Sequence, residues 1–225
     1  MPQSRKRPRH ATAIPDAGRK HGLPYAAKVG TTGPSAIEQN IFTATEHLLA
    51  TTSLDDLTVA HILDRAGISR TTFYRYFTSK HHVVSDLLTA LQAELIDVMQ
   101  PWYTRAASPP EQALTESISA VAAVWERRRP VLRACSENWH SDREIGERWV
   151  AMMDGFAEGT SRQIDHERRV GSAPKGVNSW KLAVHLTWSS ERQLYLAGFG
   201  MYGRRMERDA VDVIVATWLG SIYRE

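Results

Sequence analysis

The segment "ISRTTFYRYFTSK", residues 68–80, gathers hydroxyl, arginine and tyrosine side chains around two phenylalanines. On a helix, Phe73 and Phe77 share one face because they are four residues apart. If that face is buried, the polar side chains point away from the core, and these are Arg70, Thr71, Thr72, Tyr74 and Arg75. Such side chains hydrogen-bond to base edges and phosphates, and a helix fits the major groove of DNA. The segment therefore predicts a helix with an exposed face suited to nucleic acid.

A second short helix precedes this one in "TVAHILDRAG", across a turn that contains a glycine. Capping and stop signals come from four residues, Thr58, Gly67, Ser69 and Ser79. Helix, turn and helix in this order form the geometry of a DNA-binding helix-turn-helix. Lys80, with the free N–H groups of the helix that begins after Ser79, is suited to a phosphate. From this pattern alone, an ordinary solvated helix face remains an alternative to a DNA-binding face, because residues 36–80 hold four basic and five acidic side chains.

The alternative class of protein is an enzyme, but the sequence contains few residues in the arrangements that catalysis requires. Cys135 is the single cysteine, which excludes an intramolecular disulfide and a four-cysteine zinc site. His81 and His82 are adjacent, so on a helix they point about 100° apart and cannot bind one metal as an i, i+4 pair would. No G-x-S-x-G, H-E-x-x-H or P-loop motif occurs. We therefore expect no catalytic site, no metal and no cofactor.

Charge is distributed unevenly along the chain. Residues 1–35 hold seven basic side chains and one acidic side chain, a net charge of +6, so the other 190 residues carry −3. Residues 1–34 are rich in Pro, Gly, Thr and basic residues without periodicity, and we expect a disordered tail that either binds polyanions or only solubilises the chain. The sequence has no run of about 18 apolar residues and no secretory signal, which favours a cytoplasmic protein without a membrane span.

Beyond this tail the apolar residues recur at helical spacing, which predicts an all-α protein of about nine helices. We expect a three-helix helix-turn-helix domain at 35–80. The helices of residues 81–225 are expected to form a second domain, for ligand binding and dimerisation.

Several helix ends are signalled locally. Ser35 and Glu38 have the spacing of a capping box, in which each side chain satisfies a backbone donor of the first turn. Pro101 is expected to end the fourth helix. "SPPE" at 108–111 and "SDRE" at 141–144 are expected to cap two later helices through their serines.

The stretch "LTVAHILDRAGISRTTFYRYFTSKHHVV" resembles the N-terminal signature of the TetR family of bacterial transcription regulators. The string A-G-[IV]-S-x-x-T-F-Y-x-Y-F-x-[ST]-K carries the resemblance, which covers residues 36 to about 85. It implies a DNA-binding repressor whose recognition helix follows Ser69. The residues implied to contact bases or the nearby backbone are Arg70, Thr71, Thr72 and Tyr74, and Ser69 is expected among the DNA-binding residues as well. The residues implied to contact phosphates are Thr58, Tyr76 and Lys80.

The C-terminal half resembles one branch of that family, the ethionamide-activation repressors of mycobacteria, over residues 118–171, in "ERQLYLAGF" and in "WLGSIYRE". Aromatic stripes at helical spacing are usually core, but the resemblance implies a tubular apolar cavity for a lipophilic small molecule. The apolar lining expected is Leu114, Ile118, Val121, Trp125, Trp149, Met153, Phe156, Leu194 and Trp218. The polar groups expected in it are Asn138, Thr160, Thr187 and Ser190. Thr187 and Ser190 stand where the branch carries amide side chains that hydrogen-bond to the ligand.

The last two expected helices, at 178–198 and 206–223, carry apolar residues that need a partner, namely Leu182, Leu186, Leu196, Val211, Ile214, Val215, Trp218, Leu219 and Ile222. In the family such helices pair across a two-fold axis. The resemblance therefore implies a homodimer through these helices, with recognition helices about 34–36 Å apart on a near-palindromic operator of double-stranded DNA. A ligand that fits only when the DNA-binding heads are splayed would release that operator.

A cationic ligand is the alternative to a neutral one. A drug-efflux repressor of the same fold would need an acidic side chain in its cavity, and the candidates are Glu137, Glu158 and Glu191. Because few acidic residues are available, neutral lipophilic ligands are the favoured expectation.

Overall fold

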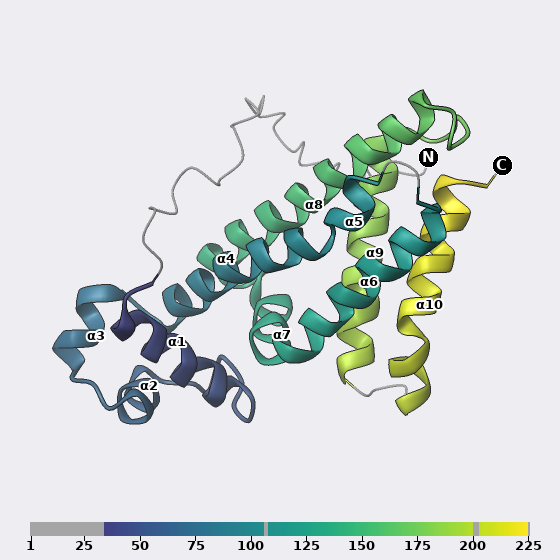
Figure 1. Ribbon diagram of the computed structural model, residues 1–225. Coiled ribbons are helices and arrows are strands. Elements are labelled where there is room, and N and C mark those ends of the chain that lie inside the picture. The colour runs from purple at the N-terminus through teal and green to yellow at the C-terminus, as the bar shows by residue number, and fades with distance from the viewer. Residues whose placement is uncertain (1–33, 106–107, 200–202, 225) are drawn as a thin grey trace, which may run out of the picture. The chain divides into compact units, whose positions relative to one another are not determined.

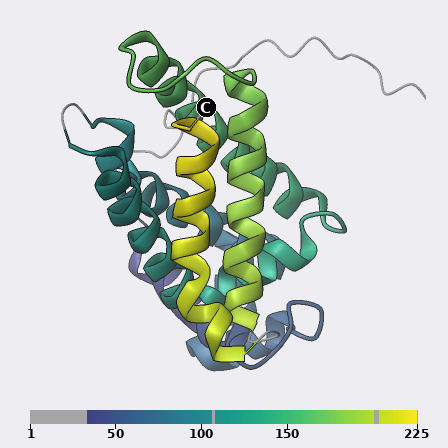
Figure 2. The same cartoon turned by 90° about the vertical axis from the view of Figure 1, so that its right-hand side faces the viewer.

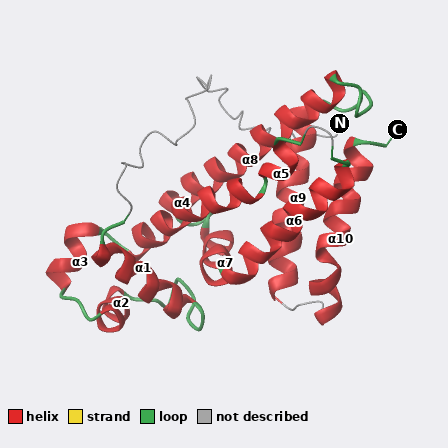
Figure 3. Cartoon of the chain, viewed as in Figure 1, coloured by secondary structure: helices red, strands yellow, loops and turns green. Residues whose placement is uncertain are grey.

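The computed structural model describes residues 34–105, 108–199 and 203–224, the side chains of 203–208 excepted. The tail predicted at 1–34 lies outside these residues apart from Pro34. Within the described ranges the chain forms ten α-helices and no strand, which confirms the all-α prediction (Figures 1 and 3). The helices are α1 (Ala36–Leu49), α2 (Val59–Ala66), α3 (Arg70–Tyr76), α4 (Lys80–Val98), α5 (Gln100–Tyr103), α6 (Pro110–Arg127), α7 (Arg129–Asn138), α8 (Arg143–Arg169), α9 (Ser179–Phe199) and α10 (Gly203–Ile222).

The helix-turn-helix is built from local signals that act as predicted. Thr58, Ser69 and Ser79 each accept a hydrogen bond from a backbone N–H in the first turn of the helix that follows. Ser35 and Glu38 form the reciprocal capping box of α1. Gly67 ends α2 in the left-handed region at φ 63°, where a residue with a Cβ is strained.

Three predicted helix ends are wrong. Asp142, and not Ser141, caps α8 by accepting from the Ile145 N–H at 2.9 Å. Ser108 does not cap α6, whose N-cap position is Pro109 without a side-chain hydrogen bond. The fourth helix ends at Val98, before Pro101, which lies in the first turn of the additional short helix α5. A proline is tolerated there because the first N–H groups of a helix have no intrahelical partner.

Phe73 and Phe77 fix the orientation of α3, as their spacing predicts. Their side chains are 0% and 1% exposed, and their ring centroids are 5.9 Å apart. Phe42 of α1 packs against Phe77 at 5.5 Å, and Ile62 of α2 is fully buried beside them. Burying each such side chain contributes about 1.5–3 kcal/mol. We call α1–α3, held by this cluster, the head.

The head shares a core with the helices that follow it. α4 packs against α1, α6, α7 and α8, and one continuous buried cluster includes Phe77, Leu88 and Trp149. Residues 34–225 accordingly form one compact unit, and the boundary at 80/81 stays a prediction. α9 and α10 lie side by side along their lengths (Figure 2). A second cluster joins α5, α6, α9 and α10 around Trp102 and Trp218.

Candidate DNA-binding face and ligand cavity

The polar face predicted on α3 points away from the core. Arg70, Thr71 and Tyr74 are exposed, with Tyr74 at 47%. The Arg70 guanidinium lies 5.8 Å from the centroid of the Tyr74 ring, within the range of a cation–π contact. Thr72 is half-buried, and its Oγ1 lies 2.8 Å from the Oγ of Ser69. The capping serine and the first turn of α3 therefore form one hydrogen-bonded unit, beside which arginine and tyrosine stand free of the core.

Two of the residues expected at phosphates, Thr58 and Tyr76, differ in their exposure. Thr58 is exposed at the start of α2, where its Oγ1 accepts from the His61 N–H at 3.2 Å. Tyr76 is half-buried and packs against the core of the head. A hydroxyl can donate as well as accept, so both side chains keep the chemistry of a phosphate contact.

The prediction for Lys80 needs correction. Its Nζ donates to three backbone carbonyls of the α1–α2 connection, those of Leu54 at 2.7 Å, Asp55 at 2.9 Å and Leu57 at 2.7 Å. An ammonium group has three N–H donors, so all three are occupied. In this conformation Lys80 ties the start of α4 to the α1–α2 connection and has no N–H left for a phosphate.

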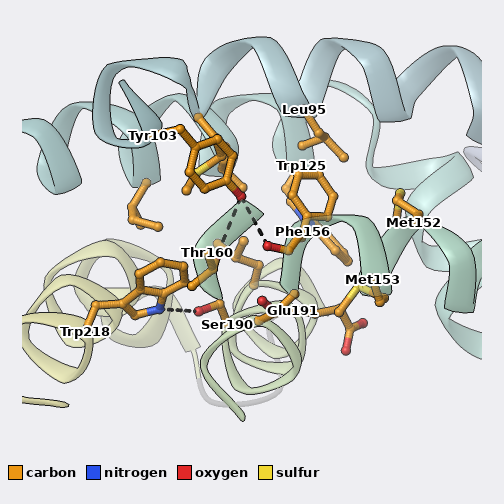
Figure 4. A pocket seen from close by; sticks show the side chains of 15 residues that line it. Leu95, Tyr103, Trp125, Met152, Met153, Phe156, Thr160, Ser190, Glu191 and Trp218 are labelled. Atoms are coloured by element: carbon orange, nitrogen blue, oxygen red, sulfur yellow. Dashed lines mark hydrogen bonds between the residues drawn. The ribbon is translucent and has the colours of Figure 1, made fainter. Parts of the chain in front are cut away.

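An apolar cavity of about 70 Å³ lies among α4, α6, α8, α9 and α10, with α5 closing one side (Figure 4). Leu95 and Tyr103 stand on one side of it and Ser190, Glu191 and Trp218 on the other. Ten of the residues predicted as ligand contacts line it, namely Ile118, Val121, Trp125, Met153, Phe156, Thr160, Thr187, Ser190, Leu194 and Trp218.

Three predicted ligand contacts lie elsewhere. Leu114 and Trp149 are fully buried in the two core clusters, so the pattern of apolar spacing there signals packing alone. Asn138 does not line the cavity, and its amide Nδ2 donates to the Ala134 carbonyl of its own helix at 2.8 Å.

Four lining residues were not predicted, and they are Leu95, Met99, Tyr103 and Met152, while a fifth, Glu191, was named only as an acidic candidate for a cationic ligand. Leu95 is a buried apolar residue of α4 and Met99 is the buried residue that ends it, but helical spacing of apolar residues does not show which other element they contact. Tyr103 was missed because Pro101 was read as the end of a helix, whereas α5 carries the chain on toward α6.

Most polar groups of the cavity are paired with one another. The Trp218 Nε1–H donates to the Ser190 Oγ at 2.9 Å, and that hydroxyl donates to the Leu186 carbonyl at 2.7 Å. The Tyr103 hydroxyl donates to the Phe156 carbonyl at 3.4 Å and lies 3.5 Å from the Thr160 Oγ1 (Figure 4). Burial raises the pKa of Tyr103 to about 12, so the phenol stays neutral.

Of the three acidic candidates, only Glu191 lines the described cavity. Its residue is 5% exposed, its Oε1 accepts from the Ser136 hydroxyl at 2.7 Å, and burial raises the pKa of the carboxyl. Glu137 instead accepts from the Tyr195 hydroxyl at 3.0 Å, and Glu158 is exposed on α8.

Polar contacts tie the start of α4 to the first half of α8. The His81 Nδ1 lies 3.0 Å from Asp142, the residue that caps α8. Arg148 of α8 bonds to the Asp86 carboxylate at 3.1 Å and to the Thr89 hydroxyl at 2.7 Å. The two helices that are joined here next to the head both line the cavity farther along.

The described part of the chain holds no group of three or more His, Cys, Asp or Glu side chains placed to bind a metal. Cys135 is fully buried, and burial raises the pKa of its thiol, which suppresses the reactive thiolate. Among the described helices, none is long and apolar enough to cross a membrane.

Comparisons with known proteins agree with this architecture. Residues 41–87 match the model of bacterial regulatory proteins of the tetR family, and residues 114–224 match that of the C-terminal domain of transcriptional regulator EthR. The chain is 30% identical over 213 residues to the HTH-type transcriptional regulator EthR of Mycobacterium tuberculosis, which covers 93% of this chain and 97% of that protein. It is 27% identical over 186 residues to EthR of Mycolicibacterium smegmatis, which covers 83% and 86%.

A solved structure of the fatty acid degradation regulator FadR from Bacillus halodurans superposes with a TM-score of 0.72 and covers 84% of this chain and 97% of that one. At 13% identity it shows the fold alone. The helical fold and the sequence relatives place the chain among transcriptional regulators and not among enzymes. The chain belongs to the TetR family of bacterial regulatory proteins and is a DNA-binding transcriptional regulator with an EthR-type C-terminal domain.

Proposed function

We propose that this regulator is a cytoplasmic repressor that binds a near-palindromic operator as a homodimer and leaves it when a lipophilic small molecule enters the cavity. The observation that carries the proposal is the exposed polar face of α3, held outward by the buried Phe73–Phe77 pair. A helix presented in this way can enter the major groove while the rest of the head rests on the backbone.

Specific contacts to DNA are assigned to the exposed residues of that face. Arg70 suits the acceptor edge of a guanine, where a well-placed contact discriminates by about 1–3 kcal/mol. Thr71 and Tyr74 supply hydroxyls to bases or to the nearby backbone, and Thr58 and Tyr76 supply hydroxyls to phosphates. Lys80 supports the head from within instead of contacting DNA.

Dimerisation is assigned to the outer faces of α9 and α10, but through other residues than those expected. Most of the apolar residues predicted to pair between chains are buried within one chain, including Leu186, Ile214 and Trp218. Among the described side chains of α9 and α10, the large apolar ones that are exposed are Trp180 at 40%, Phe199 at 50% and Val213 at 48%.

The outer face of α10 suits a close pairing of helices. Ala216 and Thr217 are exposed on α10 together with Val213, and α10 lies side by side with α9 (Figure 2). Two copies related by a two-fold axis would cover this face with its own duplicate.

Ligand control follows from the size of the cavity. A volume of about 70 Å³ is far below the roughly 300–1,000 Å³ of sites that hold drug-sized ligands. A ligand therefore enters only a conformation in which the surrounding helices have moved apart. If operator DNA prefers the closed conformation, the ligand lowers operator affinity by its own differential affinity, which is typically about 1–3 kcal/mol.

A mobility-shift titration with the DNA upstream of the protein's own gene tests the proposal. The wild type should bind in the presence of excess non-specific competitor, and the double variant Arg70→Ala, Tyr74→Ala should not. Arg169→Ala, which removes an exposed arginine at the far end of α8, is the matched control and should bind as the wild type does. Equal binding by the double variant and the control would contradict the assignment of α3 as the recognition helix.

A further inference from the structure

Two buried oxygen atoms of the cavity lack hydrogen bonds. The Thr187 Oγ1 and the Glu191 Oε2 have no hydrogen-bond partner among the described residues. Both residues belong to α9, four positions apart, and both line the cavity, where they are 8% and 5% exposed. A buried polar atom without a partner is costly and rare in native proteins, so this pair calls for an explanation.

Within the described part of the protein, only one of the two oxygens of the Glu191 carboxyl accepts a hydrogen bond. Ser136 donates to the Oε1 at 2.7 Å. The Arg192 guanidinium approaches the Oε2 to 3.5 Å without forming a hydrogen bond, and it lies 4.7 Å from the centroid of the Tyr195 ring. Because Arg192 is itself 47% exposed at its side chain, it is partly hydrated and screened. On the side of the cavity no basic side chain faces the carboxylate among the lining residues.

The hydrogen bonds of the other polar groups of the cavity indicate which kind of ligand group would complement the remaining atoms. The Trp218 N–H, the Ser190 hydroxyl and the Tyr103 hydroxyl already donate within the protein. The atoms left over are the Thr187 hydroxyl oxygen, which can accept as well as donate, and an oxygen of Glu191, which in the ionised carboxylate only accepts. The complementary group on a ligand is therefore one that donates.

We infer that the effector of this regulator carries an N–H donor, most favourably a primary or secondary amine, on an apolar body, and that Thr187 and Glu191 of α9 receive this group. The inference rests on the proposed function and specifies the ligand of the same cavity. The apolar body packs against residues such as Trp125 and Phe156, and the amine supplies the positive charge that a carboxylate in a low-dielectric site needs. The sequence favoured a neutral ligand, and the position of Glu191 reverses that preference.

Three probes with the same body and different end groups test the inference, namely 4-phenylbutylamine, 4-phenylbutanol and 4-phenylbutyrate. Their affinities are measured by isothermal titration calorimetry with the full-length wild type, Glu191→Gln, Thr187→Val and the control Glu158→Gln. Glu158 is exposed on the same helix that carries Phe156 and does not line the cavity, so the control removes a carboxylate without touching the site.

The wild type and the control should bind the amine about 10- to 100-fold more tightly than the alcohol, which corresponds to one hydrogen bond to a charged group. Glu191→Gln should lose most of this preference while the affinity for the alcohol changes much less, and Thr187→Val should lose a smaller part. An amine that binds no more tightly than the alcohol overturns the inference, and so does a preference that survives in Glu191→Gln. Tightest binding of the carboxylate also overturns it and points instead to the groove lined by Arg129 and Arg133, which shares Trp125 with the cavity.

The same probes in the mobility-shift assay separate this inference from the proposed function. Release of operator DNA by the alcohol and the amine alike would leave the repressor mechanism standing and refute the amine specificity. Binding of no probe by the wild type would refute the inference that this cavity receives an amine on an apolar body, whereas operator binding by the wild type would leave the DNA-binding part of the proposed function standing. Thermal unfolding of each variant verifies that the compared proteins are folded.

Discussion

Replacing Lys80 by methionine should destabilise the protein and should leave the number of its phosphate contacts unchanged. The lysine ammonium donates to the carbonyls of Leu54, Asp55 and Leu57 at 2.7, 2.9 and 2.7 Å. A hydrogen bond from a charged group is worth about 1.5–3 kcal/mol, but these carbonyls are partly accessible to water once released, so we expect a total loss of about 2–4 kcal/mol. In a chain of this size each kcal/mol lowers Tm by about 2–4 °C, which makes the expected fall about 4–16 °C.

The salt dependence of operator binding distinguishes this support from a contact with DNA. If Lys80 neutralised one phosphate per chain, a dimer of the methionine variant would lose about 1.8 from the slope of log affinity against log salt. We expect the slope to stay unchanged at a temperature where the variant is folded. Lys80→Arg is the informative control, because a planar guanidinium binds phosphate well but cannot direct three donors onto three carbonyls as an ammonium can. Wild-type stability in Lys80→Met, with the slope reduced by about 1.8, would refute the structural role.

Two further substitutions test the core of the head and the buried carboxyl. Phe77→Ala should cost about 3–5 kcal/mol of stability because it leaves a cavity beneath α3, while Tyr74→Ala, on the exposed face, should cost about 0.5 kcal/mol or less. Chemical denaturation of both variants measures the difference in stability. Equal losses would contradict the assignment of Phe77 to the buried face and Tyr74 to the exposed face. Burial raises the pKa of Glu191, so the folded state holds its proton to higher pH than the unfolded state, and the free energy of unfolding should fall as pH rises from the ordinary carboxyl pKa through the raised one. Glu191→Gln should remove this fall, so that the stability of the variant relative to wild type is greater at pH 8 than at pH 5. Parallel pH profiles of the two proteins would contradict the raised pKa of Glu191.

Local signals made the head predictable from its sequence. Thr58, Gly67 and Ser69 act through bonds that span three or four residues, so their roles can be read without knowledge of the fold. Phe73 and Phe77 lie four apart on a short helix, and no other face of that helix is apolar enough to be buried.

Contacts between distant segments were not predictable in the same way. Lys80 has the residue type of a phosphate ligand, and only the fold brings it to carbonyls 23 to 26 residues earlier. Trp149 and Trp125 have the same apolar character, yet one is buried in a core cluster and the other lines the cavity. The apolar faces of α9 and α10 indicated a partner, but spacing cannot tell whether that partner is the same chain or a second copy.

The contacts that join α4 to α8 near the head would act as a pivot, a fixed point about which α4 turns when its other end is displaced. From Asp86, which bonds to Arg148, to Met99 at the cavity, the chain advances about 20 Å at 1.5 Å per residue. If these contacts hold while a ligand displaces Met99 by about 2 Å, α4 turns by about 6°. Because the head adjoins the pivot, it changes its direction more than its position. In a dimer whose recognition helices must fit grooves about 34–36 Å apart, such a tilt would misalign both helices with their grooves at once.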